Sequence, residues 1–355
     1  MDTTIEYLMW ISGRPADTRH NLGSSALSRK ADRWPVPDRL ADLPNPDRSL
    51  VGLLANEYGV DRSNVLVAPG ATGANVFAAT AALADGERVL VEQPGYEPLH
   101  ATPASLGASI DRFNRPAPDY RLDPDRIADS IEPDTALVTI TNRHNPSGRR
   151  VGRDKLATVA SVVADHGATL LVDEVYAPFG TAPTEGRTAF GGPTAAGLPN
   201  TVVTGSLTKF HGLGGLRIGW VIGPETFVKR ARIASSHVTG VAAPSRALAR
   251  RALAGHDELA ADSRELIAEN TALLSRFVDS RDDLAGPVFD GCTYGALTHD
   301  RMDGDAVSRA AEAAGILVVP GRFFDAPGRF RISLGMSPDD CEAALDAFGA
   351  VLDGC

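Results

Sequence analysis

The chain has 355 residues, of which 43% are hydrophobic and 23% charged, so it falls in the globular range and is long enough for two domains. Its formal net charge of −10 and its pI near 5.3 argue against nucleic acid or an anionic membrane as the main partner, because both attract clustered positive charge. Only four residues are lysines, against 31 arginines. That bias indicates a GC-rich genome rather than a particular chemistry.

The cysteine pattern and the N-terminus both suggest a cytoplasmic protein. Cys292, Cys341 and Cys355 stand far apart and lack CxxC spacing, so we expect neither a metal site nor a disulfide framework. The apolar stretch over residues 8–11 is too short for a secretory signal or a membrane span. We expect it to form a docking helix or arm.

Between residues 65 and 223, short β-branched runs alternate with amphipathic stretches. This alternation predicts crossover units and a mostly parallel α/β sheet with helices on both faces. Ligands of such sheets gather at the carboxyl ends of the strands. The predicted strands are VLVAPG, RVLVEQPG, ALVTITN, TLLVDEVY, TVVTGS and RIGWVIG.

The pattern then changes to long helical segments, three short strands (CTYGALTHD, ILVVP and FRISLG) and a final helix over residues 338–352. It predicts a second, smaller α+β domain, on which the N-terminal arm packs. The expected division is a large domain at residues 47–235, and a small domain at residues 236–355 together with an arm at residues 1–46.

Lys209 follows the run TVVTGS and stands between hydroxyl residues and a glycine-rich turn. A lone lysine after a strand is usually a solvated surface group. Lysine is rare in this chain, however, so a lysine in this position favours a functional role. A Schiff-base lysine needs a neutral amine near an electrophilic aldehyde. Ser206 and Arg217 are suited to bind a phosphate of the same ligand.

The segment SLTKFHGLGGLRIGW resembles the cofactor-lysine signature of the class I/II aminotransferases. NRHNPSG, with Asn145, and VDEVY, with Asp173 and Tyr176, resemble two further motifs of that family, and Asp173 precedes Lys209 by a typical 36 residues. The resemblance implies fold type I of the pyridoxal-phosphate-dependent transferases, with a mostly parallel sheet of the seven-stranded type. It also implies pyridoxal 5′-phosphate held by Lys209 as a Schiff base. The length is similar to that of the histidinol-phosphate aminotransferases.

The same resemblance assigns roles around the pyridine ring. Asp173 follows a buried strand, where a lone carboxylate is costly unless it meets a cation. The protonated ring nitrogen would be that cation and would make the ring an electron sink. The alternative for Asp173 is a helix cap. Asn145 and Tyr176 would donate to the phenolate oxygen, although Asn-Pro-Ser-Gly is also an ordinary turn. His144 is expected to be a polar neighbour or a surface residue.

The turn before an Ala-rich helix resembles the family's phosphate site. The resemblance assigns Ala71 and Thr72 to the phosphate, where helix N-terminal amides favour an anion. An ordinary strand-to-helix turn is the alternative. Tyr96 would stack on the pyridine ring, or else be a structural tyrosine at a strand end.

Arg331, in FRIS, matches the family arginine that forks onto the substrate α-carboxylate, a bidentate contact that lysine does not make. Arg329 and Arg322 are the alternatives. One departure is Leu43, in LPNP, where many relatives carry a tyrosine that reaches the neighbouring subunit's phosphate. Another is CTYG, beginning at Cys292, where the family's asparagine is not evident.

The sequence thus predicts an aminotransferase that moves an amino group from an α-amino acid to a 2-oxo acid, 2-oxoglutarate being the expected acceptor. We expect a homodimer without a nucleic-acid or membrane partner. The first alternative is a decarboxylase or lyase of the same fold, similar to threonine-phosphate decarboxylase. The second is a non-catalytic, aminotransferase-like sensor domain. The amino donor is left open.

Overall fold

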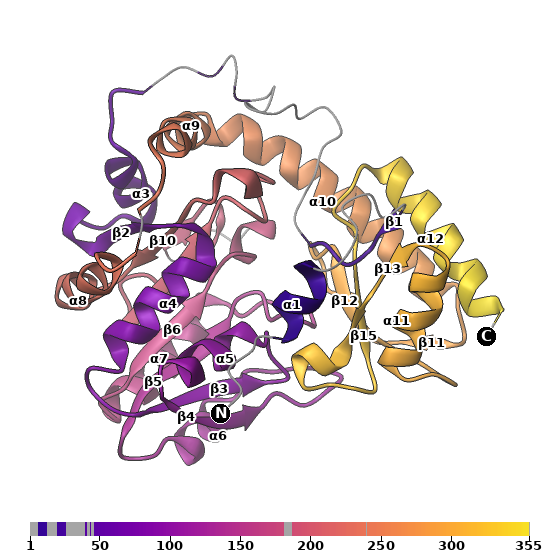
Figure 1. Cartoon of the computed structure of the whole chain (residues 1–355), viewed down its shortest axis with the longest axis horizontal. Coiled ribbons are helices and arrows are strands. Elements are labelled where there is room, and N and C mark those ends of the chain that lie inside the picture. The colour runs from indigo at the N-terminus through magenta and orange to yellow at the C-terminus, as the bar shows by residue number, and fades with distance from the viewer. Residues whose placement is uncertain are drawn as a thin grey trace.

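The structure is a computed structural model and describes residues 6–12, 20–25, 40, 43, 46–180, 187–238 and 240–354, without the side chains of residues 8, 9 and 12. Its centre is a seven-stranded sheet in the order β2-β10-β9-β6-β5-β3-β4 (Figure 1). The strands are β2 (Val65–Ala68), β3 (Arg88–Gln93), β4 (Ser109–Asn114), β5 (Thr135–Thr141), β6 (Thr169–Asp173), β9 (Thr201–Ser206) and β10 (Gly219–Ile222).

Six of these strands run in one direction, and β10 is antiparallel to both of its neighbours. Every residue of β5 is buried, as is typical of a parallel strand that is covered on both faces. The prediction of a mostly parallel sheet of the seven-stranded type is therefore confirmed. The six predicted strand runs correspond to β2, β3, β5, β6, β9 and β10.

Helices cover both faces of the sheet and bury separate cores against them. On one face, α7 presents Leu156, Val159, Ala160 and Val163 at helical spacing. The first face carries α3 (Leu50–Tyr58), α6 (Pro124–Ser130), α7 (Arg153–Asp165) and α9 (Ala243–Ala254). The other face carries α4 (Gly70–Ala82), α5 (Pro98–Ser105) and α8 (Glu225–Ser235).

A smaller α+β unit follows, as expected. Its sheet has the order β11-β12-β15-β14, and α10 runs from the large sheet across to it (Figure 1). Its elements are α10 (His256–Asp279), β11 (Leu284–Ala285), β12 (Tyr294–His299), α11 (Gly304–Ala313), β13 (Ile316–Leu317), β14 (Val319–Pro320), β15 (Phe330–Ser333) and α12 (Pro338–Asp353). The remaining elements are α1 (Glu6–Ser12), β1 (His20–Asn21), β7 (Thr188–Ala189), β8 (Gly192–Pro193) and the 3-10 turns η1 (Arg62–Asn64), η2 (Ala177–Phe179), η3 (Gly214–Leu216) and η4 (Gly321–Phe324).

Several details differ from the sequence-based expectations. The edge strand β4 was not predicted, because it carries charged and polar residues and lacks a continuous apolar run. Of its six residues only Phe113 is buried. The run ILVVP forms two short strands, of which β13 pairs with β1 and β14 with β15. The helix α9 buries Ala249 and Ala252 in the core of the large sheet. The domain division stays a proposal, and this packing favours a boundary inside α10.

Two negative findings apply to these described ranges alone. None of their helices is long and apolar enough to cross a membrane. They also contain no group of three or more His, Cys, Asp or Glu side chains that could hold a metal ion. Cys292 and Cys341 are buried and free, and Cys355 lies outside the described residues.

Candidate active site

A cavity of about 420 Å³ lies at the carboxyl ends of β5, β6 and β9. Its walls also include the start of α4, the arginine of β15 and the short helix α1, which lies between the two sheets in Figure 1. All ten site residues predicted from the sequence line this cavity: Ala71, Thr72, Tyr96, Asn145, Asp173, Tyr176, Ser206, Lys209, Arg217 and Arg331. The structure thus brings the whole predicted set together, while the role of each residue toward a ligand stays a proposal.

Lys209 lies three residues beyond the end of β9. Its Nζ donates a hydrogen bond to the Ser25 Oγ at 3.3 Å and lies 5.7 Å from the centre of the Tyr176 ring. Burial lowers the pKa of the Lys209 amine from its ordinary value. A depressed pKa favours the neutral amine that attack on an aldehyde requires.

Asp173 is the last residue of β6 and is buried. Its Oδ2 accepts from the Asn75 Nδ2 at 2.9 Å, and its Oδ1 accepts from the Val175 amide at 3.1 Å. The amide oxygen of Asn75 in turn accepts from the Thr204 hydroxyl at 2.7 Å. Burial raises the pKa of Asp173, and no described residue forms an ion pair with it. A buried carboxylate without a cation partner suits a protonated ring nitrogen.

The start of α4 forms a second polar end of the cavity. Ala71 and Thr72 lie in the first turn, and the N-cap residue, Pro69, makes no side-chain hydrogen bond to it. Arg217 lies against the same turn, because a Cβ built on Gly70 would come within 2.7 Å of the Arg217 Nη2. Gly70 also has a φ of +76°, which favours glycine. Helix amides and a guanidinium together make a site for an anion such as a phosphate.

Two tyrosines lie between these polar groups. The Tyr176 hydroxyl shares a short hydrogen bond with the Ser25 Oγ, and its ring centre lies 4.8 Å from that of Tyr294. The Tyr96 ring meets the Tyr7 ring edge-on, with 5.6 Å between centres. Tyr176 therefore lies beside Lys209, and Tyr96 lines the same cavity.

Arg331 is fully buried on β15 and meets the loop that follows β5. Its Nη1 donates to the Asn145 Oδ1 at 2.7 Å and its Nη2 to the Gly23 carbonyl at 3.1 Å, while its buried Nε has no partner among the described residues. The two alternatives are occupied elsewhere, since Arg329 donates to the Ala296 carbonyl and Arg322 pairs with Asp305. Only Arg331 of these three arginines lines the cavity.

The sequence-based reading missed several residues of the cavity wall or its support. Asn75 lies one helical turn after Ala71, and an amide in an Ala-rich helix facing a sheet was the signal that could have found it. Tyr7 lines the cavity, and Ser25 bonds Lys209 and Tyr176. Tyr7 and Ser25 belong to the N-terminal segment, and no local sequence pattern predicts that they contact the cavity.

The noted departures are also placed. Leu43 packs against Gly255 and does not line the cavity, while residues 44 and 45 lie outside the described residues. Tyr294, in the CTYG stretch, packs against Tyr176. His144 is not a surface residue: it is buried between the Ser147 hydroxyl and the Pro94 carbonyl, and burial lowers its pKa well below the ordinary value.

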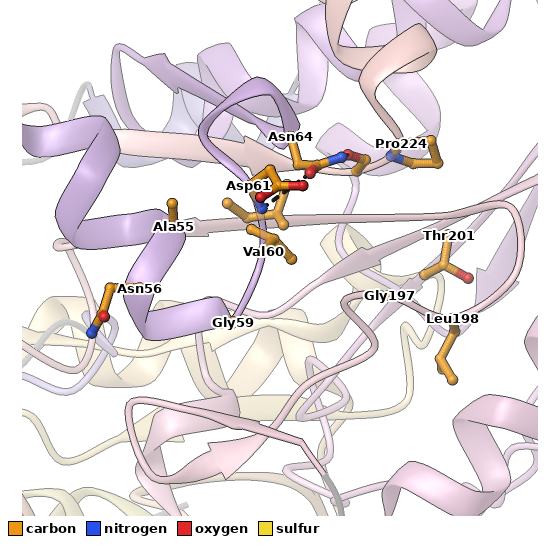
Figure 2. Close-up of a pocket in the computed structure, with 12 residues that line it drawn as sticks. Ala55, Asn56, Gly59, Val60, Asp61, Asn64, Gly197, Leu198, Thr201 and Pro224 are labelled. Carbon is orange, nitrogen blue, oxygen red and sulfur yellow. Dashed lines mark hydrogen bonds between the residues drawn. The ribbon is translucent and has the colours of Figure 1, made fainter.

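A separate hollow of about 600 Å³ lies beyond the C-terminus of α3, and Figure 2 shows Asp61, Asn64 and Pro224 on its wall. Asn64 is engaged there, accepting from the Asp61 amide and donating to the Gly223 carbonyl. None of the predicted site residues lines this hollow. We assign it no role.

Comparison with known proteins agrees with this geometry. Over residues 43–348 the chain matches the family described as aminotransferase class I and II. An aspartate aminotransferase from Streptomyces avermitilis is 26% identical over 308 residues, which cover 80% of this chain and 72% of that protein. A histidinol-phosphate aminotransferase from Halobacterium salinarum is 26% identical over 310 residues, which cover 86% and 81%.

Solved structures give the same result at the level of the fold. A pyridoxal-phosphate-dependent aminotransferase from Streptococcus suis has a TM-score of 0.86 at 20% identity, covering 100% of this chain and 99% of that one. The pyridoxal-phosphate-dependent cyclase OrfR has a TM-score of 0.81 at 25% identity, covering 100% and 98%. The fold is therefore that of the type I pyridoxal-phosphate-dependent enzymes.

The chain belongs to the class I and II aminotransferases. Its cofactor is accordingly pyridoxal 5′-phosphate, and the cavity fits that molecule. Asp173 supplies a buried carboxylate that forms no ion pair with a described residue, and Arg217 lies beside the start of α4, an arrangement that suits an anionic group.

Proposed function

We propose that this aminotransferase moves the amino group of an α-amino acid to a 2-oxo acid, with 2-oxoglutarate as the acceptor. One observation carries the proposal. The same cavity holds a lysine of lowered pKa, a buried carboxylate without a cation and a buried arginine without a carboxylate, namely Lys209, Asp173 and Arg331. Transamination of an α-amino acid needs all three groups.

The cofactor would be held by residues that already surround the cavity. Ala71, Thr72, Ser206 and Arg217 bind its phosphate, and Asp173 pairs with the ring nitrogen. Tyr96 stacks on the ring, while Asn145 and Tyr176 donate to its phenolate oxygen. When bound there, the cofactor supplies an electron-withdrawing ring that stabilises negative charge on the substrate Cα.

Lys209 carries the chemical step in this proposal. Its amine would hold the cofactor in the absence of substrate, and would be free to act as a base once the substrate amino group is bound. The Nζ, whose neutral form is favoured because burial lowers its pKa, would then accept the proton of the substrate Cα. The hydrogen bond to Ser25 and the ring of Tyr176 restrict where that nitrogen can move.

Arg331 orients the substrate. Its guanidinium is held by Asn145 and the Gly23 carbonyl, and it lies 4.9 Å from the Phe324 ring, so its direction is fixed before any ligand arrives. A substrate α-carboxylate can pair with the remaining N–H groups in the planar geometry that arginine favours. This places Cα between Arg331 and Lys209.

The second carboxylate of 2-oxoglutarate needs a further donor. In the described part of the cavity wall the arginines are Arg217, proposed for the cofactor phosphate, and Arg331, proposed for the substrate α-carboxylate. We propose that the protein is a homodimer and that the partner subunit completes the cavity and supplies that donor. The proposed location is the cytoplasm.

The test is to incubate the purified holoenzyme with each of a panel of amino acids and 2-oxoglutarate. Stoichiometric formation of glutamate and the matching keto acid supports transamination. Release of CO₂ or free ammonia without glutamate would refute it.

A second candidate is another reaction of an amino acid on the same cofactor, such as decarboxylation, elimination or cyclisation. The observation that favours it is the likeness over the whole chain to a structure described as a cyclase. It predicts turnover of an amino acid without a 2-oxo acid acceptor. The sensor-domain alternative predicts ligand binding without turnover, so the same assay separates all three.

A further inference from the structure

A second basic feature lies outside the proposed active site. A cavity of about 800 Å³ is lined by the loop that contains Asn145, at residues 143, 149 and 150, and by the end of η2. One face of α10 and residues 289–291 complete its wall. We name it the arginine groove, after four side chains on its wall: Arg143, Arg149, Arg150 and Arg264. It shares no lining residue with the active-site cavity.

Arg143 is the fixed part of the groove, because only 3% of it is exposed. Its Nη1 donates to the backbone carbonyls of Gly148 and Asp290, at 3.3 and 2.6 Å, and its buried Nε has no partner among the described residues. Gly180 makes room for the guanidinium, since a Cβ there would overlap its Nη2. Among the described residues, only carbonyl oxygens accept hydrogen bonds from this buried guanidinium.

Among the described residues that line the groove, acidic side chains do not balance the arginines. In the described ranges, Arg143, Arg149 and Arg264 form no ion pair with an Asp or Glu side chain. Asp290 is the one acidic residue among those that line the groove. Burial, with the nearby charge of Arg143, lowers the pKa of Arg150. Buried charge without a counter-ion is costly, and an anionic ligand would remove that cost.

The remaining arginines are placed to contact such a ligand. Arg149 lies 5.3 Å from the centre of the Phe289 ring and makes no side-chain hydrogen bond to a described residue. Arg264 approaches from α10, where its Nη2 donates to the Phe190 carbonyl at 2.9 Å. Guanidinium groups that line one groove from a loop and a helix favour the planar oxygens of phosphate and carboxylate.

We propose that the arginine groove binds a small polyanion with two or more phosphate or carboxylate groups. Arg143, Arg149 and Arg264, which come from one loop and one helix, and a volume of about 800 Å³ exceed what one oxyanion needs. The proposal does not depend on which amino acid the active site uses. It also does not depend on the reaction there.

The test is calorimetric titration of the holoenzyme with inorganic pyrophosphate and, separately, with citrate. Arg149→Gln and Arg264→Gln, both partly exposed, should each weaken binding by about tenfold or more, the value of one lost charge-assisted hydrogen bond. Arg309→Gln removes one charge from an exposed position on α11 and should leave the affinity unchanged. A stronger response to pyrophosphate than to citrate indicates a phosphorylated ligand, and the reverse indicates a polycarboxylate.

Three results would overturn the proposal. The first is no measurable binding of either probe at millimolar concentration. The second is an equal loss of affinity in Arg309→Gln, which would mean that only net charge matters. The third is a loss of affinity in Arg331→Lys, which would place the anion in the active-site cavity instead.

Discussion

The Nη1 of Arg331 donates a hydrogen bond to the Oδ1 of Asn145 at 2.7 Å, and this contact joins the small sheet to the loop after β5. The contact is the end of a buried chain of hydrogen bonds. The backbone N–H of Asn145 donates to the Thr141 hydroxyl, and that hydroxyl donates to the Glu92 carboxylate. Glu92 is paired with Arg115 at 2.6 Å. The orientation of Arg331 thus depends on Asn145 and, through it, on Thr141, Glu92 and Arg115.

Arg331→Lys should weaken amino-acid binding by about 1.5–3 kcal/mol, the range for hydrogen bonds to charged groups, because lysine keeps the charge and loses the planar fork. The cofactor spectrum should not change. Arg329→Lys is the matched control, since Arg329 bonds the Ala296 carbonyl outside the cavity. Spectral titration with amino acids measures both variants, and equal affinities in the two would contradict the carboxylate assignment.

Thr141→Val should lower kcat/KM by about tenfold, mainly through KM. The substitution leaves the buried backbone amide of Asn145 without its acceptor, which costs roughly 1–3 kcal/mol. The position of Asn145, and with it that of Arg331, is then less well fixed. Thr139→Val is the control, because Thr139 is buried on the same strand and its hydroxyl has no partner among the described residues. If the two valine variants behave alike in steady-state kinetics, the hydrogen-bond chain has no positioning role.

Glu174 supplies a pH-dependent contribution to stability. Burial raises its pKa to about 8 from an ordinary 4.5, while the Ala195 amide and Thr194 hydroxyl contact its carboxyl group at 2.6 and 2.8 Å. Between these two pKa values the folded chain binds a proton that the unfolded chain has lost. The free energy of unfolding should therefore fall as pH rises from about 5 to about 8.

Glu174→Gln can keep both contacts without titrating, so its unfolding midpoint should fall less over this window than that of the unaltered protein. Urea unfolding at several pH values measures the effect. Glu258→Gln, at an exposed position of α10, should leave the slope as it is. A slope in Glu174→Gln as steep as in the parent would mean that another group is responsible.

Leu43→Tyr should slow the loss of cofactor about fivefold, because in the proposed homodimer it would add a donor worth on the order of 1 kcal/mol to the phosphate of the other subunit. Leu43→Phe is the control that adds the ring without the hydroxyl. Cofactor retention after gel filtration, which also reports whether the protein is a dimer, separates them. Equal retention in both variants, or a fully active monomer, would count against the cross-subunit contact.

Much of the fold was predictable because its signals are local. Buried parallel strands such as β5 form continuous apolar runs, and the residues at their carboxyl ends converge on one edge of the sheet. The roles of Ser25 and Tyr7 were not predictable, because they depend on how a distant N-terminal segment docks. The backbone amides of Glu6 and Tyr7 donate to the Glu97 carboxylate, 91 and 90 residues away, and no local pattern encodes such a contact.

The central claim is that Lys209 is the residue that holds the cofactor. Borohydride reduction of the holoenzyme, followed by peptide mass mapping, tests it directly, since only a covalent link to a lysine can be trapped. The chain offers four lysines, Lys30, Lys155, Lys209 and Lys229. We expect the cofactor mass on the peptide with Lys209, and expect Lys209→Ala to bind the cofactor without trapping it and without turnover. Cofactor mass on another lysine, or full activity in Lys209→Ala, would contradict the account.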